Sequence, residues 1–558
     1  MRSRFDDALA AFRSGRLDEA HELATGELER GHASPELHHL VGLIECRLGR
    51  PDSGVDWLKR AAEARPGELG FRVMLIRALV DSGRADEALA AAPRPSGTSP
   101  QDITLWHARA EAADAAGRGD LSAEAWQRLC SARPSDWGAW MNLGRSLLML
   151  NRLGDAETAY RQALSINGEP EAIRQLGLVY ERANKKDELR RLLDEALERG
   201  IGADRLADLW AVRELREGHP EKAREHLNSV DPGGDPARWH RLQSKVADAL
   251  QDSTAAFEFA AAMNRATPEF DKWREQSKVF RAELQRRARA ITGEWADRLP
   301  QLPPAERTPI FLLGFPRSGT TLLDTFLMGH PEIIVLEEEG LLARAAEAVG
   351  RLESLPEVPS SHLAGVRQAY LAEIDRRMGQ RAGAAVIEKA PLNMLLAPLI
   401  HILFEGAPIL FVQRHPCDAV LSGFMQSFTP NLGMASFLDI EDAAAFYDAA
   451  MKLWTRGCAA LPLNAHTIVY EDLVRDPPKV LPDVMDFLGL VWDERLLDHR
   501  ATAATRGPVA NTSYDQITEP VTLKAVGRWR RYEKQLKPVL PLLLGWAERL
   551  GYGAFRHQ

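Results

Sequence analysis

The chain has 558 residues, too many for a single hydrophobic core, so two or three domains are expected. Hydrophobic residues make up 45% and charged residues 27% of the sequence, as in an ordinary soluble protein. The formal net charge of −9 gives no reason to expect a nucleic-acid partner.

Cysteine spacing and hydropathy favour a cytoplasmic location. The four cysteines lie far apart and form no CxxC pair, which argues against a disulfide framework or a zinc site. Acidic residues stand near the N-terminus, where a signal peptide would need an apolar core. No run of roughly 18 apolar residues occurs, so we expect no membrane-spanning helix.

A short turn motif recurs along the first half of the chain. Glycines at positions 15, 49, 83 and 117 are spaced 34 residues apart, and each lies between two segments with helical periodicity. The series continues at Asn151, Asn184 and Gly218, and Asp252 falls where an eighth turn is due. Glycine and asparagine can adopt the left-handed conformation that ends one helix before the next begins. The pattern therefore predicts a row of helical hairpins.

This row resembles the tetratricopeptide repeat (TPR), and the resemblance covers residues 1–265. It implies an all-helical superhelix whose concave groove binds a protein or peptide. The tryptophans of this region are assigned to packing between repeats. Residues 266–303 are predicted to form a charged helical adaptor, which ends where Pro303 and Pro304 cannot continue a helix.

Residues 304–558 have the pattern of an α/β domain. Short apolar runs at 310–315, 384–387, 409–412 and 467–469 alternate with helical stretches, which predicts a parallel sheet covered by helices. Ligands of such sheets bind beyond the carboxyl ends of the strands. A chemically suggestive side chain follows each run: Arg317, Lys389, Arg414 and Tyr470. We therefore predict that these residues share one active site.

The segment after the first run predicts an anion-binding loop. It reads Gly314-Phe315-Pro316-Arg317-Ser318-Gly319-Thr320-Thr321 and keeps the glycine spacing of a nucleotide-triphosphatase P-loop. Thr320 stands where that loop needs lysine, and no acidic residue after Val412 is placed to hold a metal. The loop thus suits a smaller anion without a metal, held by backbone N–H groups, Arg317 and threonine hydroxyls.

This loop resembles the 5′-phosphosulfate loop of sulfotransferases that use 3′-phosphoadenosine 5′-phosphosulfate (PAPS). Arg414 and Ser422, eight residues apart, match the pair that binds the 3′-phosphate in that family. The resemblance covers residues 308–550 and is nearest to the tyrosylprotein sulfotransferases. It implies that PAPS is the co-substrate and that six loop residues contact it: Pro316, Arg317, Ser318, Gly319, Thr320 and Thr321.

The same resemblance implies the other roles at the site. It makes Glu338 the general base, although the residues alone leave the choice open among Glu337, Glu338 and Glu339, a run that would also suit the start of a helix. Lys389 and Arg317 would stabilise charge on the transferring group, and Ser513 would steady the sulfonate. Tyr470 and Arg528 would contact the nucleotide. The motif after the lysine departs from the family pattern, because it continues Ala-Pro-Leu-Asn instead of Asp-Pro.

Three functions remain open from the sequence. The leading one is sulfation of a protein or peptide tyrosine that the TPR array selects. The second is the same chemistry on a carbohydrate, a lipid or a small hydroxylated metabolite. The third is a non-catalytic TPR scaffold, against which the joint presence of the predicted site residues argues.

Overall fold

The computed structural model describes residues 4–168, 170–230, 234–379, 383–506 and 520–553. By packing, the chain divides into two compact units, Met1–Leu206 and Ala207–Gln558. In the described part of the chain, no helix is both long enough and apolar enough to cross a membrane.

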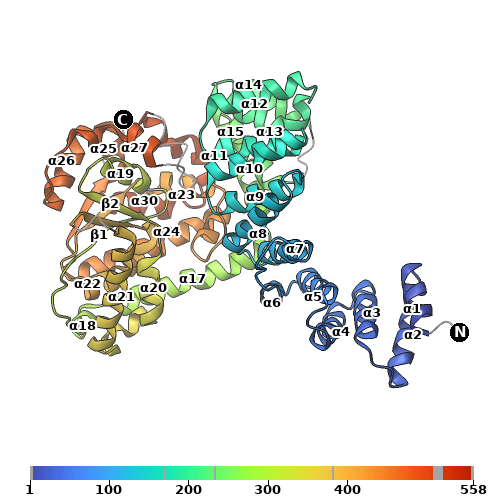
Figure 1. Cartoon of the computed structure of the whole chain (residues 1–558). Coiled ribbons are helices and arrows are strands. Elements are labelled where there is room, and N and C mark those ends of the chain that lie inside the picture. The colour runs from blue at the N-terminus through green and yellow to red at the C-terminus, as the bar shows by residue number, and fades with distance from the viewer. Residues whose placement is uncertain (1–3, 169, 231–233, 380–382, 507–519, 554–558) are drawn as a thin grey trace. The chain divides into compact units, whose positions relative to one another are not determined.

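The first unit consists of helical hairpins, as the repeat pattern predicts (Figure 1). Gly15, Gly49, Gly83 and Gly117, together with Asn151 and Asn184, have positive φ and join the two helices of their hairpins. The helices are α1 Arg4–Arg13, α2 Leu17–Glu29, α3 Pro35–Arg47, α4 Pro51–Ala64, α5 Leu69–Asp81, α6 Ala85–Ala91, α7 Pro100–Ala115, α8 Gly119–Ala132, α9 Trp137–Met149, α10 Leu153–Ile166, α11 Pro170–Arg182 and α12 Lys186–Glu198.

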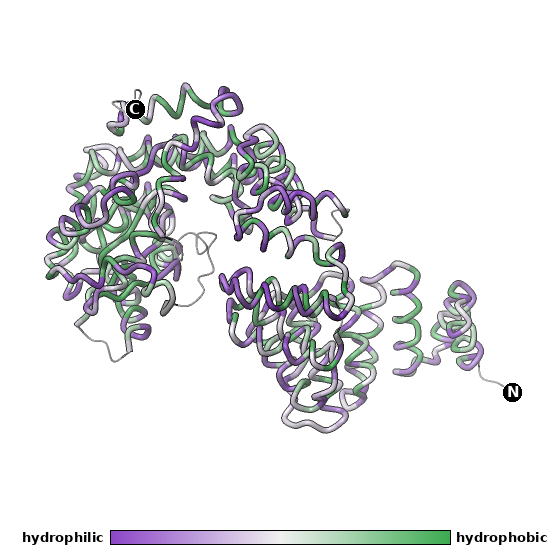
Figure 2. The backbone as a smooth tube through the Cα atoms, turned by 90° about the horizontal axis from the view of Figure 1, so that it is seen from above, coloured by the Kyte–Doolittle hydropathy of each residue, from purple (hydrophilic) through white to green (hydrophobic). Residues whose placement is uncertain are grey.

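Small residues let these helices pack closely. A Cβ added to Gly144 on α9 would lie 2.5 Å from the Tyr160 ring on α10, and one added to Gly54 on α4 would lie 2.3 Å from the Cys46 sulfur on α3. Purple and green alternate along the helices in Figure 2, as expected of helices with one buried face. Trp106 and Trp126 are buried in the array, which agrees with their predicted packing role.

The second unit begins with two more hairpins, formed by α13 Ala207–Arg216, α14 Pro220–Asn228, α15 Pro236–Ala249 and α16 Ser253–Arg265. Gly218 makes the first turn in the left-handed conformation. In the second turn, Gln251 takes that conformation and Asp252 caps α16 by accepting from the backbone N–H of Ala255. The eighth predicted turn therefore exists, with its left-handed residue one position earlier than Asp252.

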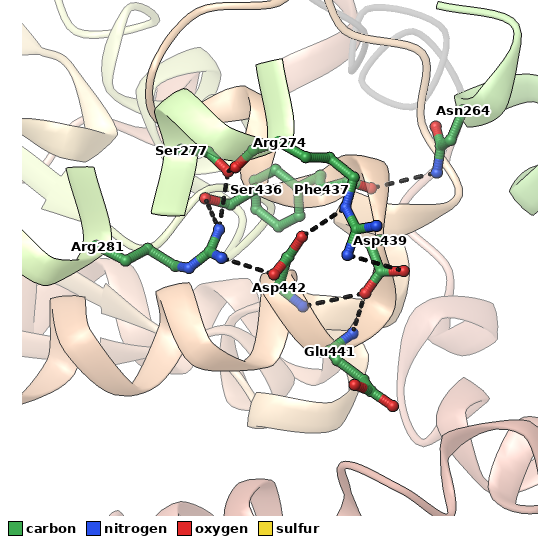
Figure 3. A network of polar contacts seen from close by, with 9 residues as sticks. All are labelled: Asn264, Arg274, Ser277, Arg281, Ser436, Phe437, Asp439, Glu441 and Asp442. Carbon is green, nitrogen blue, oxygen red and sulfur yellow. Dashed lines mark hydrogen bonds and ion pairs between the residues drawn. The ribbon is translucent and has the colours of Figure 1, made fainter. Parts of the chain in front are cut away.

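The predicted adaptor is helix α17, Phe270–Ala290, followed by the short α18, Gly293–Ala296. Arg281 on α17 is 7% exposed and donates to Asp442 at 2.6 Å and to Ser436 at 3.3 Å. Arg274 donates to the other oxygen of Asp442 at 2.8 Å. Figure 3 shows these side chains converging on Asp442 at the start of α24, Ile440–Ala460. The adaptor is thus ion-paired to the α/β domain.

The α/β domain is built on five parallel strands in the order β2-β3-β1-β4-β5. They are β1 Ile310–Gly314, β2 Ile333–Glu337, β3 Ala385–Lys389, β4 Ile409–Gln413 and β5 Ala465–Val469. The sequence predicted four of them and missed β2. Figure 1 shows the sheet among its helices.

Alternate residues of β1 point to two hydrophobic cores. Phe311 and Leu313 pack in a core with α21 Ser360–Met378, α22 Ala397–Leu403 and α24. Ile310 and Leu312 pack in a second core with α19 Thr320–Leu327 and α26 Pro477–Leu488. The helices α19 and α23 Pro416–Phe424, which follow the neighbouring strands β1 and β4, pack in different cores. A crevice at the carboxyl ends of β1 and β4 is therefore the expected ligand site.

Candidate active site

The predicted anion-binding loop connects β1 to α19 at that crevice. Arg317 and Gly319 have φ of +70° and +101°, so the loop turns sharply before α19 begins at Thr320. A Cβ on Gly319 would lie 2.3 Å from the ring of Tyr470, so any larger residue there would clash. The side chains of Ser318, Thr320 and Thr321 are buried. A tight loop thus leads into the N-terminus of α19, an arrangement that commonly binds anions.

Arg414 and Ser422 lie beside this loop. The two Nη groups of Arg414 donate to the carbonyls of Arg317 and Ala525, each at 2.7 Å, and its guanidinium lies 4.6 Å from the Tyr470 ring centroid. Its Nε is buried and has no hydrogen-bond partner among the described residues. Arg317 donates from Nε to Ser422 Oγ at 3.2 Å. Residues predicted to bind the two ends of PAPS therefore meet after β1 and β4.

The cluster is strongly cationic. Burial, followed by the neighbouring charge of Arg414, lowers the pKa of Arg317 to about 10, and the charge of Arg528 acts in the same direction. An unpaired buried donor and crowded guanidinium groups are both relieved when an anion binds. The residues present therefore fit a phosphate or sulfate group.

Lys389 is the last residue of β3, and its side chain is 0% exposed. Its Nζ lies 3.0 Å from Glu337 Oε1, 3.0 Å from Glu338 Oε1 and 3.5 Å from Asp324 Oδ2. Burial would lower the pKa of Lys389, but Asp324, Glu338 and Glu337 together raise it above its ordinary value. Lys389 therefore remains a cation at neutral pH.

The three consecutive glutamates have different surroundings. The run begins at Glu337, the last residue of β2, and ends just before helix α20, Leu341–Val349, so these carboxylates lie between a strand and a helix start. Glu338 has φ of +49°, donates its backbone N–H to the Lys389 carbonyl at 2.7 Å and is half exposed. Glu339 instead pairs with Arg377 at 3.1 Å. The geometry therefore leaves Glu337 and Glu338 beside Lys389, with Glu338 the more exposed of the two.

The motif after Lys389 serves the interior of the fold. Asn393 donates to the buried Glu388 at 3.2 Å, and Glu388 also accepts from the backbone N–H of Leu342 and from the Tyr370 hydroxyl. Burial raises the pKa of Glu388 above its ordinary value. Asn393, the last residue of the motif that departs from the family pattern, thus completes a buried hydrogen-bond network.

Sequence reasoning missed two buried carboxylates. Asp324, on α19, lies within 3.5 Å of Lys389. Asp418, on α23, accepts from the backbone N–H groups of Gly527 at 2.7 Å and Trp529 at 2.8 Å, which fixes the residue between them, Arg528. Asp324 and Asp418 are 0% and 2% exposed. The sequence signal that could have identified them is an acidic residue within an otherwise apolar helix.

The remaining predicted residues fall in the C-terminal part. Tyr470 begins α25, Tyr470–Arg475, and packs between Gly319 and Arg414. Arg528 lies close enough to affect Arg317, but one of its Nη groups pairs with Asp248 at 3.1 Å. Ser513 lies outside the described residues. In the described chain, one group with metal-ligand geometry is found, Glu214, Glu217 and His219, on α13 and the turn after it.

Comparison with known proteins assigns the two parts of the chain. Residues 309–494 match the model of the sulfotransferase family, and residues 5–68 and 107–172 match that of the tetratricopeptide repeat. The chain carries a sulfotransferase-family domain and TPRs. This confirms the predicted resemblance and the fold class, helical repeats with a P-loop-like α/β domain.

Three curated relatives are distantly similar to part of this chain, and the matches span between 40% and 67% of their own lengths. The sulfotransferase-containing chain is 28% identical over 318 residues to an uncharacterized protein of Aquifex aeolicus, covering 54% of this chain and 40% of that one. It is 27% identical over 260 residues to protein-tyrosine sulfotransferase A of Caenorhabditis elegans, covering 44% and 67%. For protein-tyrosine sulfotransferase 2 of Gallus gallus, identity is 27% over 237 residues, covering 39% and 62%.

Two solved structures each match a portion of this chain at low TM-score. The sulfotransferase domain of the Synechococcus PCC 7002 olefin synthase is 25% identical and covers 41% of this chain and 91% of that domain, with a TM-score of 0.30. A TPR protein of Parabacteroides merdae is 17% identical and covers 42% of this chain and 94% of its own, with a TM-score of 0.36.

Proposed function

We propose that this protein transfers a sulfuryl group from PAPS to an acceptor hydroxyl, most directly the phenol of a tyrosine in a protein or peptide. The observation that carries the proposal is the meeting of two groups at the carboxyl edge of one sheet. The cationic loop with Arg317 and Arg414 follows the central strands, and the Lys389–Glu338 pair follows the adjacent strands. The first group suits the donor, and the second suits the acceptor.

The donor would be held by residues around the crevice. Backbone N–H groups of residues 317–321, which include the start of α19, would receive the 5′-phosphosulfate, and Pro316 would contact it without donating. The unpaired Nε of Arg414 and the hydroxyl of Ser422 would receive the 3′-phosphate. Tyr470 and Arg528 would line the nucleotide. The family match supports PAPS as the sulfate donor.

The transfer itself would break one bond and form one. The acceptor oxygen attacks the sulfur in line, the bond from sulfur to the bridging phosphate oxygen breaks, and 3′-phosphoadenosine 5′-phosphate (PAP) leaves. A phenol has a pKa of about 10, so a base speeds its attack at neutral pH. Glu338 would accept the phenol proton, while Lys389 and Arg317 would stabilise charge on the sulfonate and the leaving oxygen. Ser513 would contact the sulfonate.

Two observations bear on the nature of the acceptor. Relatives named protein-tyrosine sulfotransferases favour tyrosine, and TPRs are a protein-binding architecture. The altered motif after Lys389 keeps a carbohydrate, lipid or small metabolite as the second candidate acceptor. We also propose a cytoplasmic location, which microscopy of the tagged protein tests directly.

Incubation with ³⁵S-labelled PAPS tests both levels of the proposal. The full chain is given a tyrosine-peptide library, a glycan panel and a panel of small phenols, each with its deoxy or phenylalanine counterpart as control. Label in tyrosine peptides alone supports the protein-tyrosine assignment, and label in glycans or small phenols alone supports the second candidate. No label in any panel, together with no calorimetric binding of PAP, would favour the non-catalytic scaffold.

A further inference from the structure

A carboxylate of the helical repeats contacts the C-terminal segment that carries Arg528. Asp248, near the end of α15, accepts from Arg531 Nη2 at 3.1 Å and from the Tyr532 hydroxyl at 2.5 Å through Oδ1. Its Oδ2 pairs with Arg528 Nη2 at 3.1 Å. Three side chains of the 3₁₀ helix Arg528–Tyr532 are therefore held by one aspartate of a repeat helix.

The rest of the α15–α16 hairpin packs on the same domain. Gln251 accepts from Arg531 at 2.7 Å, and Thr254 accepts from Gln535 at 3.1 Å. Asn264, at the far end of α16, donates to the carbonyls of Phe424 and Phe437 at 3.0 and 3.2 Å. The last of these contacts appears in Figure 3, beside the ion pairs that hold α17. The hairpin is therefore anchored at both ends and has little freedom to shift.

The segment needs such anchoring because its positive charges lie close to other cations. Arg528 lies near Arg317 and Arg414, which are themselves cations, and the segment adds Arg530 and Arg531. Like charges at short range repel, so the segment is favoured in place only where carboxylates offset them. Asp418 holds its backbone and Asp248 holds its side chains.

These contacts orient the Arg528 guanidinium but do not use all of its N–H donors. One Nη group meets Asp248 and the sulfur of Met425, at 3.1 and 3.2 Å. Its Nε is buried without a hydrogen-bond partner in the described chain, as is the Nε of Arg414. A carboxylate behind a guanidinium fixes its direction and leaves the remaining N–H groups for an anion in front.

We propose that the α15–α16 hairpin is part of the sulfuryl-donor site, with Asp248 as the positioning residue that holds Arg528 toward the nucleotide phosphate. This inference rests on the proposed function. It means that the last repeat does more than present an acceptor, because a change at α15 alters donor affinity through a direct ion pair.

The test is calorimetric binding of PAP to the full chain in four forms: unaltered, Asp248→Asn, Arg528→Gln and the double variant. Asp248→Asn is expected to weaken PAP binding by about fivefold or more, the lower range of typical coupling between sites. In the Arg528→Gln background the same change is expected to have no further effect. Steady-state rates should show a higher KM for PAPS with kcat at saturation nearly unchanged.

The control is Glu258→Gln, which removes an exposed carboxylate of α16 that makes no ion pair among the described residues. It should bind PAP as the unaltered chain does. An equal loss of affinity from Asp248→Asn in both backgrounds would indicate a general loss of structure and contradict the positioning role. Unchanged or tighter binding would also contradict it, since tighter binding would mean that Asp248 competes with the donor for Arg528.

Two further outcomes distinguish failure of the role given to Asp248 from failure of the proposed sulfotransferase function. If the unaltered chain does not bind PAP, the proposed function itself fails. If Asp248→Asn does not fold, as judged by far-UV circular dichroism, Arg531→Gln replaces it in the same cycle, because Arg531 braces the same carboxylate from the exposed side. Loss of PAP affinity that depends on Arg528 supports the inference, and loss that is independent of Arg528 overturns it.

Discussion

Lys389 is the residue on which the proposed chemistry depends most. It is fully buried, and three carboxylates surround its ammonium group. A buried cation of this kind is costly unless each partner is well placed, so its position is closely defined by β3, β2 and α19. The position suits stabilisation of charge that develops during transfer more than it suits binding of the donor in the ground state.

Replacement of Lys389 by methionine should therefore slow sulfuryl transfer. We expect kcat to fall by ~10²–10³, the usual loss for a charge-stabilising donor, while PAP affinity stays close to that of the unaltered chain. Transfer assays and calorimetry on the same preparation measure the two quantities. Arg414→Ala is the opposite case, in which PAP affinity should fall first. A Lys389→Met protein with normal kcat would contradict the role given to this residue.

Protonation of His415 should lower the free energy of unfolding at acidic pH. Burial, followed by the charges of Arg530 and Arg414, lowers the pKa of its imidazole from 6.5 to about 4. Between these values the unfolded chain binds more protons at His415 than the folded chain, so the free energy of unfolding falls as the pH drops from about 6.5 to about 4. The loss is at most about 3 kcal/mol.

His415→Asn tests this titration, because asparagine can replace the imidazole as the cap that accepts from the Cys417 N–H. Urea unfolding at several pH values should show a shallower acid-side decline for the variant. Parallel stability–pH curves for the two proteins would mean that His415 is not neutral in the folded state.

Helix packing in the repeats gives a prediction at the scale of the element. Gly144→Ala should destabilise the α9–α10 hairpin by about 1–3 kcal/mol, because its Cβ would meet the buried Tyr160 ring. Gly154→Ala, on α10, meets nothing within 4 Å and should be neutral or stabilising by up to about 1 kcal/mol. Denaturation followed by circular dichroism compares the two. Equal effects would show that close packing at Gly144 does not matter.

The elements of this fold were predictable to different degrees. The turns at 34-residue spacing carry residues that tolerate positive φ, so local chemistry marks them directly. Strand β2 was missed because its five residues follow α19 after a short turn, and its apolar run merges with the helical pattern before it. As a consequence, the strand that leads into the glutamates was not predicted, although a helix does begin soon after them, at Leu341.

Contacts between distant segments could not be predicted from local pattern. Arg317, Lys389 and Arg414 were identifiable because each lies at or after an apolar run. Asp324 is marked as an acidic residue within an apolar helix, but neither its partner nor that of Asp248 could be predicted. These partners, Lys389 and Arg528, are 65 and more than 250 residues away in the sequence. Helix periodicity marks which face is buried but not which charged group it meets.

At the scale of the molecule, the compact unit Ala207–Gln558 should function without the preceding repeats. A chain of residues 207–558 is expected to fold and to bind PAP as the full chain does. A chain of residues 304–558 lacks Asp248, Asn264 and Arg281, and we expect it to unfold at lower temperature and to bind PAP weakly. Thermal denaturation and calorimetry on the three chains test this.

The same truncated chains should show whether selection of the acceptor and binding of the donor depend on different parts of the protein. If residues 1–206 help select a protein acceptor, their removal should slow transfer to that protein and leave transfer to a small phenol unchanged. Equal rates on the protein acceptor with and without these residues would show that the first six hairpins do not select it.

The most direct measurement is the rate of ³⁵S transfer from PAPS to a tyrosine peptide by Glu338→Gln beside Glu339→Gln. The two variants change neighbouring carboxylates, of which Glu338 contacts Lys389 and Glu339 pairs with Arg377. Loss of a general base predicts a fall of ~10²–10⁴ for Glu338→Gln, with Glu339→Gln close to the unaltered rate. Full activity in Glu338→Gln, or an equal loss in both variants, would contradict the proposed site.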